Sequence, residues 1–121
     1  MARILIADDE APMREMMELA CRMDGHETHL AYDTPSTLGA YESYDPDVLI
    51  LDLYMPGGGG AFALKQLRFS RPGGVCPVIV VSGYIADMSS EAQENLDAVA
   101  IIEKPFSIDA LRSAIRAALT T

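Results

Sequence analysis

The chain has 121 residues, of which half are hydrophobic, and its 18 acidic and nine basic side chains give a formal net charge of −9. This acidity disfavours direct binding to nucleic acid, because phosphate contacts require clustered Lys or Arg, and no apolar stretch approaches the length of a membrane span. We therefore expect one domain over residues 1–121, large enough to bury its own core, with no direct nucleic-acid or membrane partner.

The N-terminal segment and the two cysteines indicate a cytoplasmic location. The segment MARILIADD is too short, and becomes acidic too soon, for a secretory signal peptide. Cys21 and Cys76 lie in apolar surroundings. We therefore expect buried thiols rather than a disulfide or a reactive site, which suits a reducing compartment.

Four short apolar runs and the segment THLAY alternate with segments of helical character. An apolar run of this length predicts a strand that is buried on both faces, as in a parallel sheet. Alternation of such strands with helices is typical of an α/β fold with right-handed crossovers. The predicted strands are ILIA at 4–7, THLAY at 28–32, VLIL at 48–51, VIVV at 78–81 and VAII at 99–102.

Proline and glycine residues mark the ends of the first two predicted helices. Pro12 suits a first helical turn, and Gly25 should end the helix that it starts. Pro35 lies at the start of a weaker helix over residues 34–44. Apolar residues recur at helical spacing in the first helix and predict a core face rather than a binding groove; they are Met13, Met16, Met17, Ala20 and Met23.

The second half of the chain has weaker signals. Four glycines at 57–60 lack the GK[ST] ending of a phosphate-binding loop, so we expect a flexible loop that leads into a helix over residues 61–69. Residues 86–97 are polar and only faintly amphipathic, which predicts the least firmly packed helix. Ser107 should cap the last helix, whose apolar face is formed by Ile108, Leu111, Ile115 and Leu119.

Acidic, hydroxyl and basic side chains stand where four of the predicted strands end. Ligands of parallel sheets bind outside the carboxyl ends of the strands, so we expect one pocket to collect Asp8, Asp9, Asp52, Ser82 and Lys104. Taken singly, Asp8 could equally be a helix cap or a turn former, Ser82 a turn residue and Lys104 a solvated charge.

As a group, these side chains predict phosphoryl chemistry. Clustered carboxylates repel one another unless a cation joins them, and a few hard oxygen ligands with room for water favour Mg²⁺. Lys104 and Ser82 supply a positive charge and a hydrogen-bond donor for the oxygens of a phosphoryl group. Asp52 stands alone after its strand and would be the nucleophile, giving an aspartyl phosphate.

In this order the residues resemble the receiver domain of two-component response regulators, over essentially the whole chain. The resemblance implies a flavodoxin-like fold, a doubly wound five-stranded parallel sheet with strand order 2-1-3-4-5. The motifs that carry it are the pair Asp8-Asp9, the D-L-x-M-P phrase from Asp52 to Pro56, Gly60 eight residues after that aspartate, Ser82-Gly83 and Lys104-Pro105-Phe106.

The same resemblance implies a role for each acidic residue. Asp52 would accept the phosphoryl group from a phosphohistidine on a sensor histidine kinase or a histidine phosphotransfer protein. Mg²⁺ would bind Asp9 and Asp52, with Asp8 acting mostly through water and Tyr54 through its backbone carbonyl.

The remaining implied roles concern the phosphoryl oxygens and the output. Ser82 and Lys104 would contact the phosphoryl oxygens. The chain would catalyse only its own phosphorylation and dephosphorylation, so it would not be an enzyme in the usual sense. It would signal as a monomer or weak dimer by contact with a downstream protein target that the sequence does not identify.

Two features depart from the family pattern. Three residues before the lysine the family usually carries Tyr or Phe, whose ring moves when the hydroxyl residue moves toward the phosphate. Ile101 stands there instead, so this aromatic signalling route is in doubt. Tyr54 and Tyr84 occupy the positions two beyond Asp52 and Ser82, which in this family border the path of hydrolytic water.

Other functions remain open from the sequence. The chain could shuttle phosphate between histidine-containing proteins, or be a receiver excised from a hybrid kinase or a longer regulator. A small Mg²⁺-dependent aspartyl-phosphate phosphatase on a similar scaffold is a different class. Haloacid-dehalogenase-like phosphatases, however, have an acid two residues after their nucleophile, where this chain has Tyr54.

Overall fold

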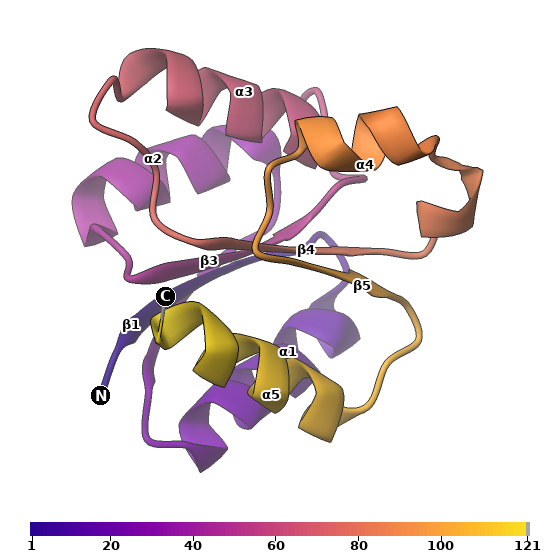
Figure 1. The fold of residues 1–121 in the computed structure, drawn as a ribbon. Coiled ribbons are helices and arrows are strands. Elements are labelled where there is room, and N and C mark those ends of the chain that lie inside the picture. Colours follow the sequence, from indigo (N-terminus) through magenta and orange to yellow (C-terminus); the bar gives the residue numbers. More distant parts are fainter. Residues whose placement is uncertain (121) are drawn as a thin grey trace.

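The computed structural model of the protein describes residues 1–120. Its centre is a sheet of five parallel strands in the order β2-β1-β3-β4-β5 (Figure 1). This order is the doubly wound topology expected from the sequence, and each strand lies within one residue of its predicted bounds. The strands are β1 (Arg3–Ala7), β2 (Glu27–Ala31), β3 (Val48–Asp52), β4 (Val78–Ser82) and β5 (Ala100–Glu103).

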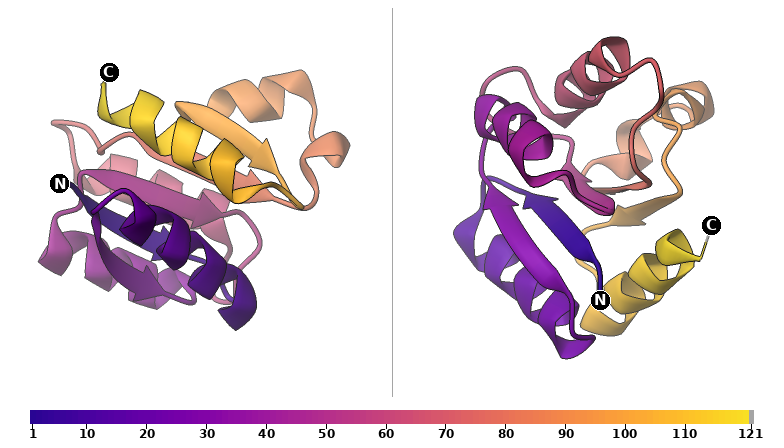
Figure 2. Two further views of the ribbon diagram at one scale, coloured as in Figure 1. Left: turned by 90° about the horizontal axis from the view of Figure 1, so that it is seen from below. Right: turned by 90° about the vertical axis from the view of Figure 1, so that its left-hand side faces the viewer.

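Helices cover both faces of the sheet. One face carries α1 (Ala11–Met23) and α5 (Ile108–Leu119), and the other carries α2 (Thr34–Tyr44), α3 (Gly60–Ser70) and α4 (Ser90–Asn95) (Figure 1). The right-hand view of Figure 2 shows the strands between the two helical layers, and the left-hand view looks through α1 and α5 onto the sheet. Within residues 1–120, no helix is long and apolar enough to cross a membrane.

The core consists of two layers divided by the sheet. Every residue of β3 and β4 is buried, and successive side chains point to opposite faces. Leu49 and Leu51 pack on the side of α2 and α3, whereas Ile50 packs on the side of α1 and α5. The run at 99–102 was predicted to be buried on both faces, and this is wrong. Val99 is exposed and β5 is only partly buried because it is an edge strand.

Helix α1 ends before Gly25, as predicted, and its predicted methionine core face is confirmed in part. Gly25 adopts a positive φ of 78° directly after the helix, a conformation that glycine tolerates best. Met17 is fully buried, and Met13 and Met16 pack partly against the same core layer. Met23 is 53% exposed, so its assignment to the core face is wrong. It lies in the last turn, beyond the packed part of the helix.

The predicted helix over residues 86–97 is broken into two pieces. A short 3₁₀ turn spans Ile85–Asp87, and the six-residue helix α4 follows. Ser89 separates them because its backbone is extended and its hydroxyl accepts a hydrogen bond from the amide of Ala92, which starts a new helix. No residue of α4 is buried, in agreement with the weak packing that the sequence predicts.

The last helix packs against the first. The Ser107 hydroxyl caps α5 by accepting a hydrogen bond from the amide of Ala110. Leu111 and Ile115 are buried as predicted, but Leu119 is 37% exposed, and Ala118 takes its place in the core.

Both cysteines are free thiols. Cys21 is buried, and burial raises its pKa to about 12, whereas Cys76 is only half-buried.

Candidate phosphoryl-transfer site

Four parallel strands deliver the predicted site residues to one edge of the sheet. Asp8 follows β1, Asp52 ends β3, Ser82 ends β4 and Lys104 follows β5. In the sheet register, Ala7 lies beside Leu51 and Ser82 lies beside Glu103, so the four strand ends are at the same level. The carboxyl edge of the sheet therefore brings these residues together, as the sequence predicts.

Asp52 lies at the centre of this edge and is only 3% exposed. Its carboxylate accepts hydrogen bonds from the amide of Tyr54 at 3.2 Å and from Nζ of Lys104 at 3.1 Å. Burial raises the pKa of Asp52 above its ordinary value and the charge of Asp8 adds to the rise, while the two hydrogen bonds oppose it. An added Cβ at Gly60 would overlap the backbone carbonyl of Asp52, so only glycine fits where α3 begins.

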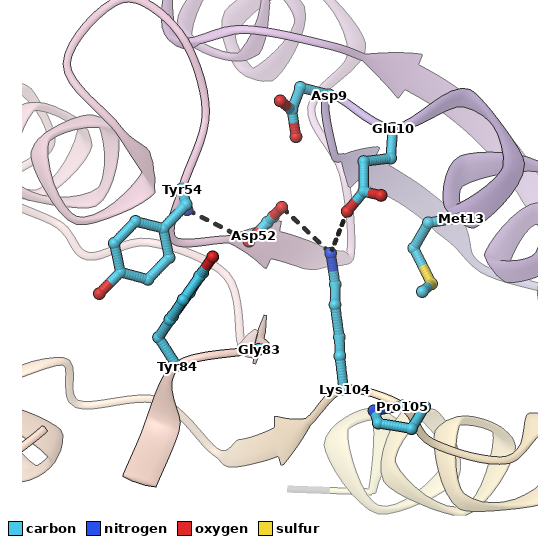
Figure 3. A pocket seen from close by; sticks show the side chains of 9 residues that line it. All are labelled: Asp9, Glu10, Met13, Asp52, Tyr54, Gly83, Tyr84, Lys104 and Pro105. Atoms are coloured by element: carbon cyan, nitrogen blue, oxygen red, sulfur yellow. Dashed lines mark hydrogen bonds and ion pairs between the residues drawn. The ribbon is translucent and has the colours of Figure 1, made fainter. Parts of the chain in front are cut away.

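Lys104 is the cation of the site. Its Nζ lies 2.8 Å from a carboxylate oxygen of Asp8. It also lies 3.1 Å from Asp52 and 3.6 Å from Glu10, as Figure 3 shows. Burial alone would lower the pKa of this ammonium group, but the hydrogen bonds and charges of Asp8 and Asp52 outweigh burial and raise it. Lys104 is therefore held in its charged form, where it balances carboxylates that are almost fully removed from water.

The acidic residues form a cluster that could hold a metal ion. Asp8, Asp9, Glu10 and Asp52 each offer a carboxylate oxygen, and these oxygens all lie within 4.8 Å of one another. Asp8 and Asp52 are buried, whereas Asp9 and Glu10 are exposed. A compact set of hard oxygen donors, half of it open to solvent, fits a divalent cation that keeps part of its water shell.

Glu10 is a site residue that the sequence reasoning did not assign. It directly follows the acidic pair, and its backbone amide donates to Oδ1 of Asp8 at 2.9 Å. This turn brings the Glu10 carboxylate back over the pocket toward Lys104 (Figure 3). The available signal was three consecutive acids at a strand end, of which only the first two were given a role.

The pocket at this edge has a volume of about 600 Å³. Two predicted residues do not line it, because Asp8 and Ser82 are both fully buried beneath its floor. The Ser82 hydroxyl accepts a hydrogen bond from the amide of Tyr84 at 3.1 Å. The walls are formed by Asp9, Glu10, Met13, Asp52, Tyr54, Gly83, Tyr84, Lys104 and Pro105 (Figure 3).

Two tyrosines lie beside Asp52 at the mouth of the pocket. The rings of Tyr54 and Tyr84 meet edge to face, with their centroids 4.7 Å apart (Figure 3). The two residues are 52% and 55% exposed, and both line the pocket together with Asp52. Ile101 is half-buried and packs against the core layer below α2 and α3.

Comparison with known proteins identifies the class of this fold and site. The family model of the response regulator receiver domain matches residues 4–116. The chain therefore belongs to the response regulator receiver family of two-component signal transduction. This match disfavours the alternative that the chain is a small Mg²⁺-dependent phosphatase.

The chain is similar in sequence to part of several known regulatory proteins. The chain is 33% identical to regulatory protein AtoC of Escherichia coli over 97% of this chain and 25% of AtoC. It is 32% identical to sensory transduction protein RegX3 of Mycolicibacterium smegmatis over 98% of this chain and 51% of RegX3. The chain thus spans between a quarter and about half of the length of these curated relatives.

Solved structures agree with the family. The receiver domain of NtrX from Brucella abortus superposes with a TM-score of 0.86 at 31% identity, covering 98% of each chain. A CheY-like receiver domain protein from Methanospirillum hungatei superposes with a TM-score of 0.85 at 27% identity, covering 98% of this chain and 93% of the other.

Proposed function

We propose that Asp52 is the phosphoacceptor of this receiver domain. The observation that supports this most is the position of its carboxylate, which lies at the end of the central strand β3, on the floor of the pocket, 3.1 Å from the Lys104 ammonium. Asp9 and Glu10 also reach the pocket, but both are exposed and flank its rim. Asp52 alone combines burial with an opening toward an incoming phosphoryl group.

The transfer is an in-line displacement at phosphorus. A carboxylate oxygen of Asp52 forms the new O–P bond while the N–P bond of a phosphohistidine breaks, and the electron pair stays on the imidazole nitrogen, which then takes up a proton. The donor is a sensor histidine kinase or a histidine phosphotransfer protein. Asp52 needs no separate base, because a carboxylate nucleophile carries no proton that must be removed before it attacks.

Mg²⁺ would be held by the carboxylates of Asp9, Asp52, Asp8 and Glu10. The backbone carbonyl of Tyr54 would be a further ligand. When bound, the ion neutralises negative charge on the phosphoryl oxygens. The protein's own contribution is to gather the carboxylate oxygens at the ends of the strands before the reaction begins. Little reorganisation is then needed at the moment of transfer.

Lys104 and Ser82 complete the phosphoryl site. The ammonium of Lys104 is positioned to move from the Asp8 and Asp52 carboxylates to a phosphoryl oxygen on Asp52. Ser82 is fully buried below the pocket floor, where its hydroxyl accepts a hydrogen bond from the Tyr84 amide, so it would reach the phosphoryl group when the turn that contains Tyr84 moves. This movement is the change that a downstream protein would read.

Acetyl phosphate tests the assignment. We expect one phosphoryl group per chain by intact mass in the presence of Mg²⁺, and none with excess chelator or in Asp52→Asn. The matched control is Asp87→Asn, which removes an exposed carboxylate in the 3₁₀ turn after β4 and should label as the wild type does. Undiminished labelling of Asp52→Asn would overturn the proposal.

A further inference from the structure

The helix α3 differs in charge from an otherwise acidic protein. Lys65 and Arg68 lie on it, Arg71 follows directly, and its sequence GAFALKQLRFS contains no acidic residue. Among residues 1–120, none of these three cations is paired with a carboxylate. Arg68 instead donates to the backbone carbonyl of Asp97, and Arg71 lies over the ring of Tyr41.

Two phenylalanines lie on the same side of α3 as its cations. Phe62 is 45% exposed and Phe69 is 86% exposed. Residues separated by three, four or seven positions share one side of a helix, so Phe62, Lys65 and Phe69 form a single stripe with Arg68 at its flank. We call these four residues the aromatic–basic face of α3. The buried residues of α3 are others, namely Gly60, Ala63, Leu64 and Leu67. The helix lies on the side of the sheet that also carries α2 and α4 (Figure 1).

This face has a fixed aromatic anchor and an adjoining hollow. The ring of Phe62 packs over Gly58, where an added Cβ would lie 3.0 Å from the ring. Next to Phe62, Ala61 lines a mostly apolar hollow of about 720 Å³ whose walls include Met55 and Met88, and Asp9, which also lines the phosphoryl-transfer pocket, is its one charged residue. A partner that covers the face can therefore bury apolar side chains without first ordering the surface that receives them.

We propose that the aromatic–basic face of α3 is a docking surface for an acidic amphipathic segment of another protein. Apolar side chains of the segment would cover Phe62 and Phe69, and its carboxylates would meet Lys65 and Arg68. Exposed aromatic rings beside cations that have no carboxylate partner are complementary to this pattern.

The charge of the molecule disfavours other occupants. A second copy docked through the same face would bring Lys65 and Arg68 against their own copies, which is repulsive. A membrane surface or a nucleic acid is an extended polyanion, and it would be repelled by the remaining surface of a chain with net charge −9. A short acidic segment needs to contact only the aromatic–basic face.

The test is fluorescence anisotropy with a labelled helical peptide of about four turns that carries Glu on one face and Leu and Phe on the other. We expect saturable binding to the full chain, weaker binding of a peptide with Gln in place of Glu, and loss of affinity at high salt. Lys65→Glu and Phe69→Ser should each weaken binding about tenfold. Both positions are exposed, so the variants should keep their fold.

Two variants on the opposite side of the molecule serve as controls. Arg116→Glu makes the same charge change on α5, and Leu19→Ser removes a 53% exposed apolar side chain from α1. Both should bind the acidic peptide within about twofold of the wild type. The proposal is overturned if the acidic peptide does not bind, if the control variants weaken binding as much as Lys65→Glu, or if anionic vesicles or an oligonucleotide compete for the face.

Discussion

Replacing Lys104 with methionine should destabilise the fold strongly, and it should do so for an electrostatic reason. The ammonium lies 2.8 Å from Asp8, whose side chain is fully buried, and 3.1 Å from Asp52, whose side chain is 5% exposed. Methionine keeps most of the side-chain volume but leaves both carboxylates without a counter-charge. Breaking a buried pair in this way costs about 3–5 kcal/mol in free energy of unfolding.

We expect the lower end of this range, about 3 kcal/mol, because the pocket is open to water on one side and partial hydration relieves the carboxylates. For a domain of this size, such a loss lowers the melting temperature by about 10 °C. The assay is thermal and urea unfolding at low ionic strength without divalent ions. Lys65→Met is the matched control, because Lys65 is exposed and unpaired, and it should change stability by less than about 0.5 kcal/mol.

The pH dependence distinguishes charge repulsion from lost packing. The pKa of Asp52 is already raised by burial, and the variant removes the ammonium that lowers it, so the folded state should bind a proton more readily than the unfolded state. The stability deficit of Lys104→Met should therefore shrink as the pH falls from about 7 to about 5. Millimolar Mg²⁺ should also restore part of the deficit, because the ion replaces the missing charge. A deficit equal to that of Lys65→Met, or one unchanged by pH and Mg²⁺, would refute this reasoning.

Three further predictions concern the pocket and its support. Replacing Tyr54 and Tyr84 together with Asn should accelerate hydrolysis of the phosphorylated protein about tenfold, because water then reaches phosphorus in better alignment. Mg²⁺ should raise the melting temperature of the wild type, and Asp9→Ala should abolish this shift while raising stability in its absence, because it relieves repulsion between carboxylates. Gly60→Ala should lower the free energy of unfolding by about 2 kcal/mol, because the new Cβ would overlap the Asp52 carbonyl. Gly39 lies in α2 with open space around it, so Gly39→Ala should raise the free energy of unfolding by about 0.8 kcal/mol.

Each of these predictions has a direct check. Hydrolysis is followed by the decay of the phosphorylated mass after the donor is removed, with Tyr32→Asn as the control for loss of an exposed tyrosine; an unchanged or slower decay contradicts gating by the two rings. The Mg²⁺ prediction requires constant ionic strength, and a melting curve that the ion does not move argues against a preformed site. Equal stability of the two glycine variants would show that the close approach at Gly60 is not a constraint.

The strands and the residues at their ends were predictable because buried parallel strands leave a strong local signal. An unbroken apolar run followed by a charged residue specifies both a strand and the edge at which its last side chain emerges. Asp52 and Lys104 were assigned to one pocket on this basis, and their side chains lie 3.1 Å apart although the residues are 52 positions apart in the sequence.

The errors arose where tertiary context decides the outcome. The exposure of β5 depends on its place at the edge of the sheet, which a run of apolar residues does not encode. Ser82 emerges at the expected edge, but its hydroxyl turns to the Tyr84 amide and lies below the pocket floor. The sequence did not show why glycine is needed at these four positions, because the reason lies in the folded backbone. Gly57, Gly58 and Gly59 adopt positive φ, and Gly60 is required by its contact with the Asp52 carbonyl.

The measurement that tests the central claim most directly is the chemical location of the phosphoryl group. The protein is phosphorylated with acetyl phosphate and Mg²⁺, the acyl phosphate is reduced with borohydride to homoserine, and the digested chain is sequenced by tandem mass spectrometry. We predict homoserine at position 52 and at no other acidic position, with none formed in a sample kept in chelator. Homoserine at Asp9, hydroxynorvaline (the product that glutamyl phosphate would give) at Glu10, or an unmodified Asp52 in a protein that carries the label, would contradict the account.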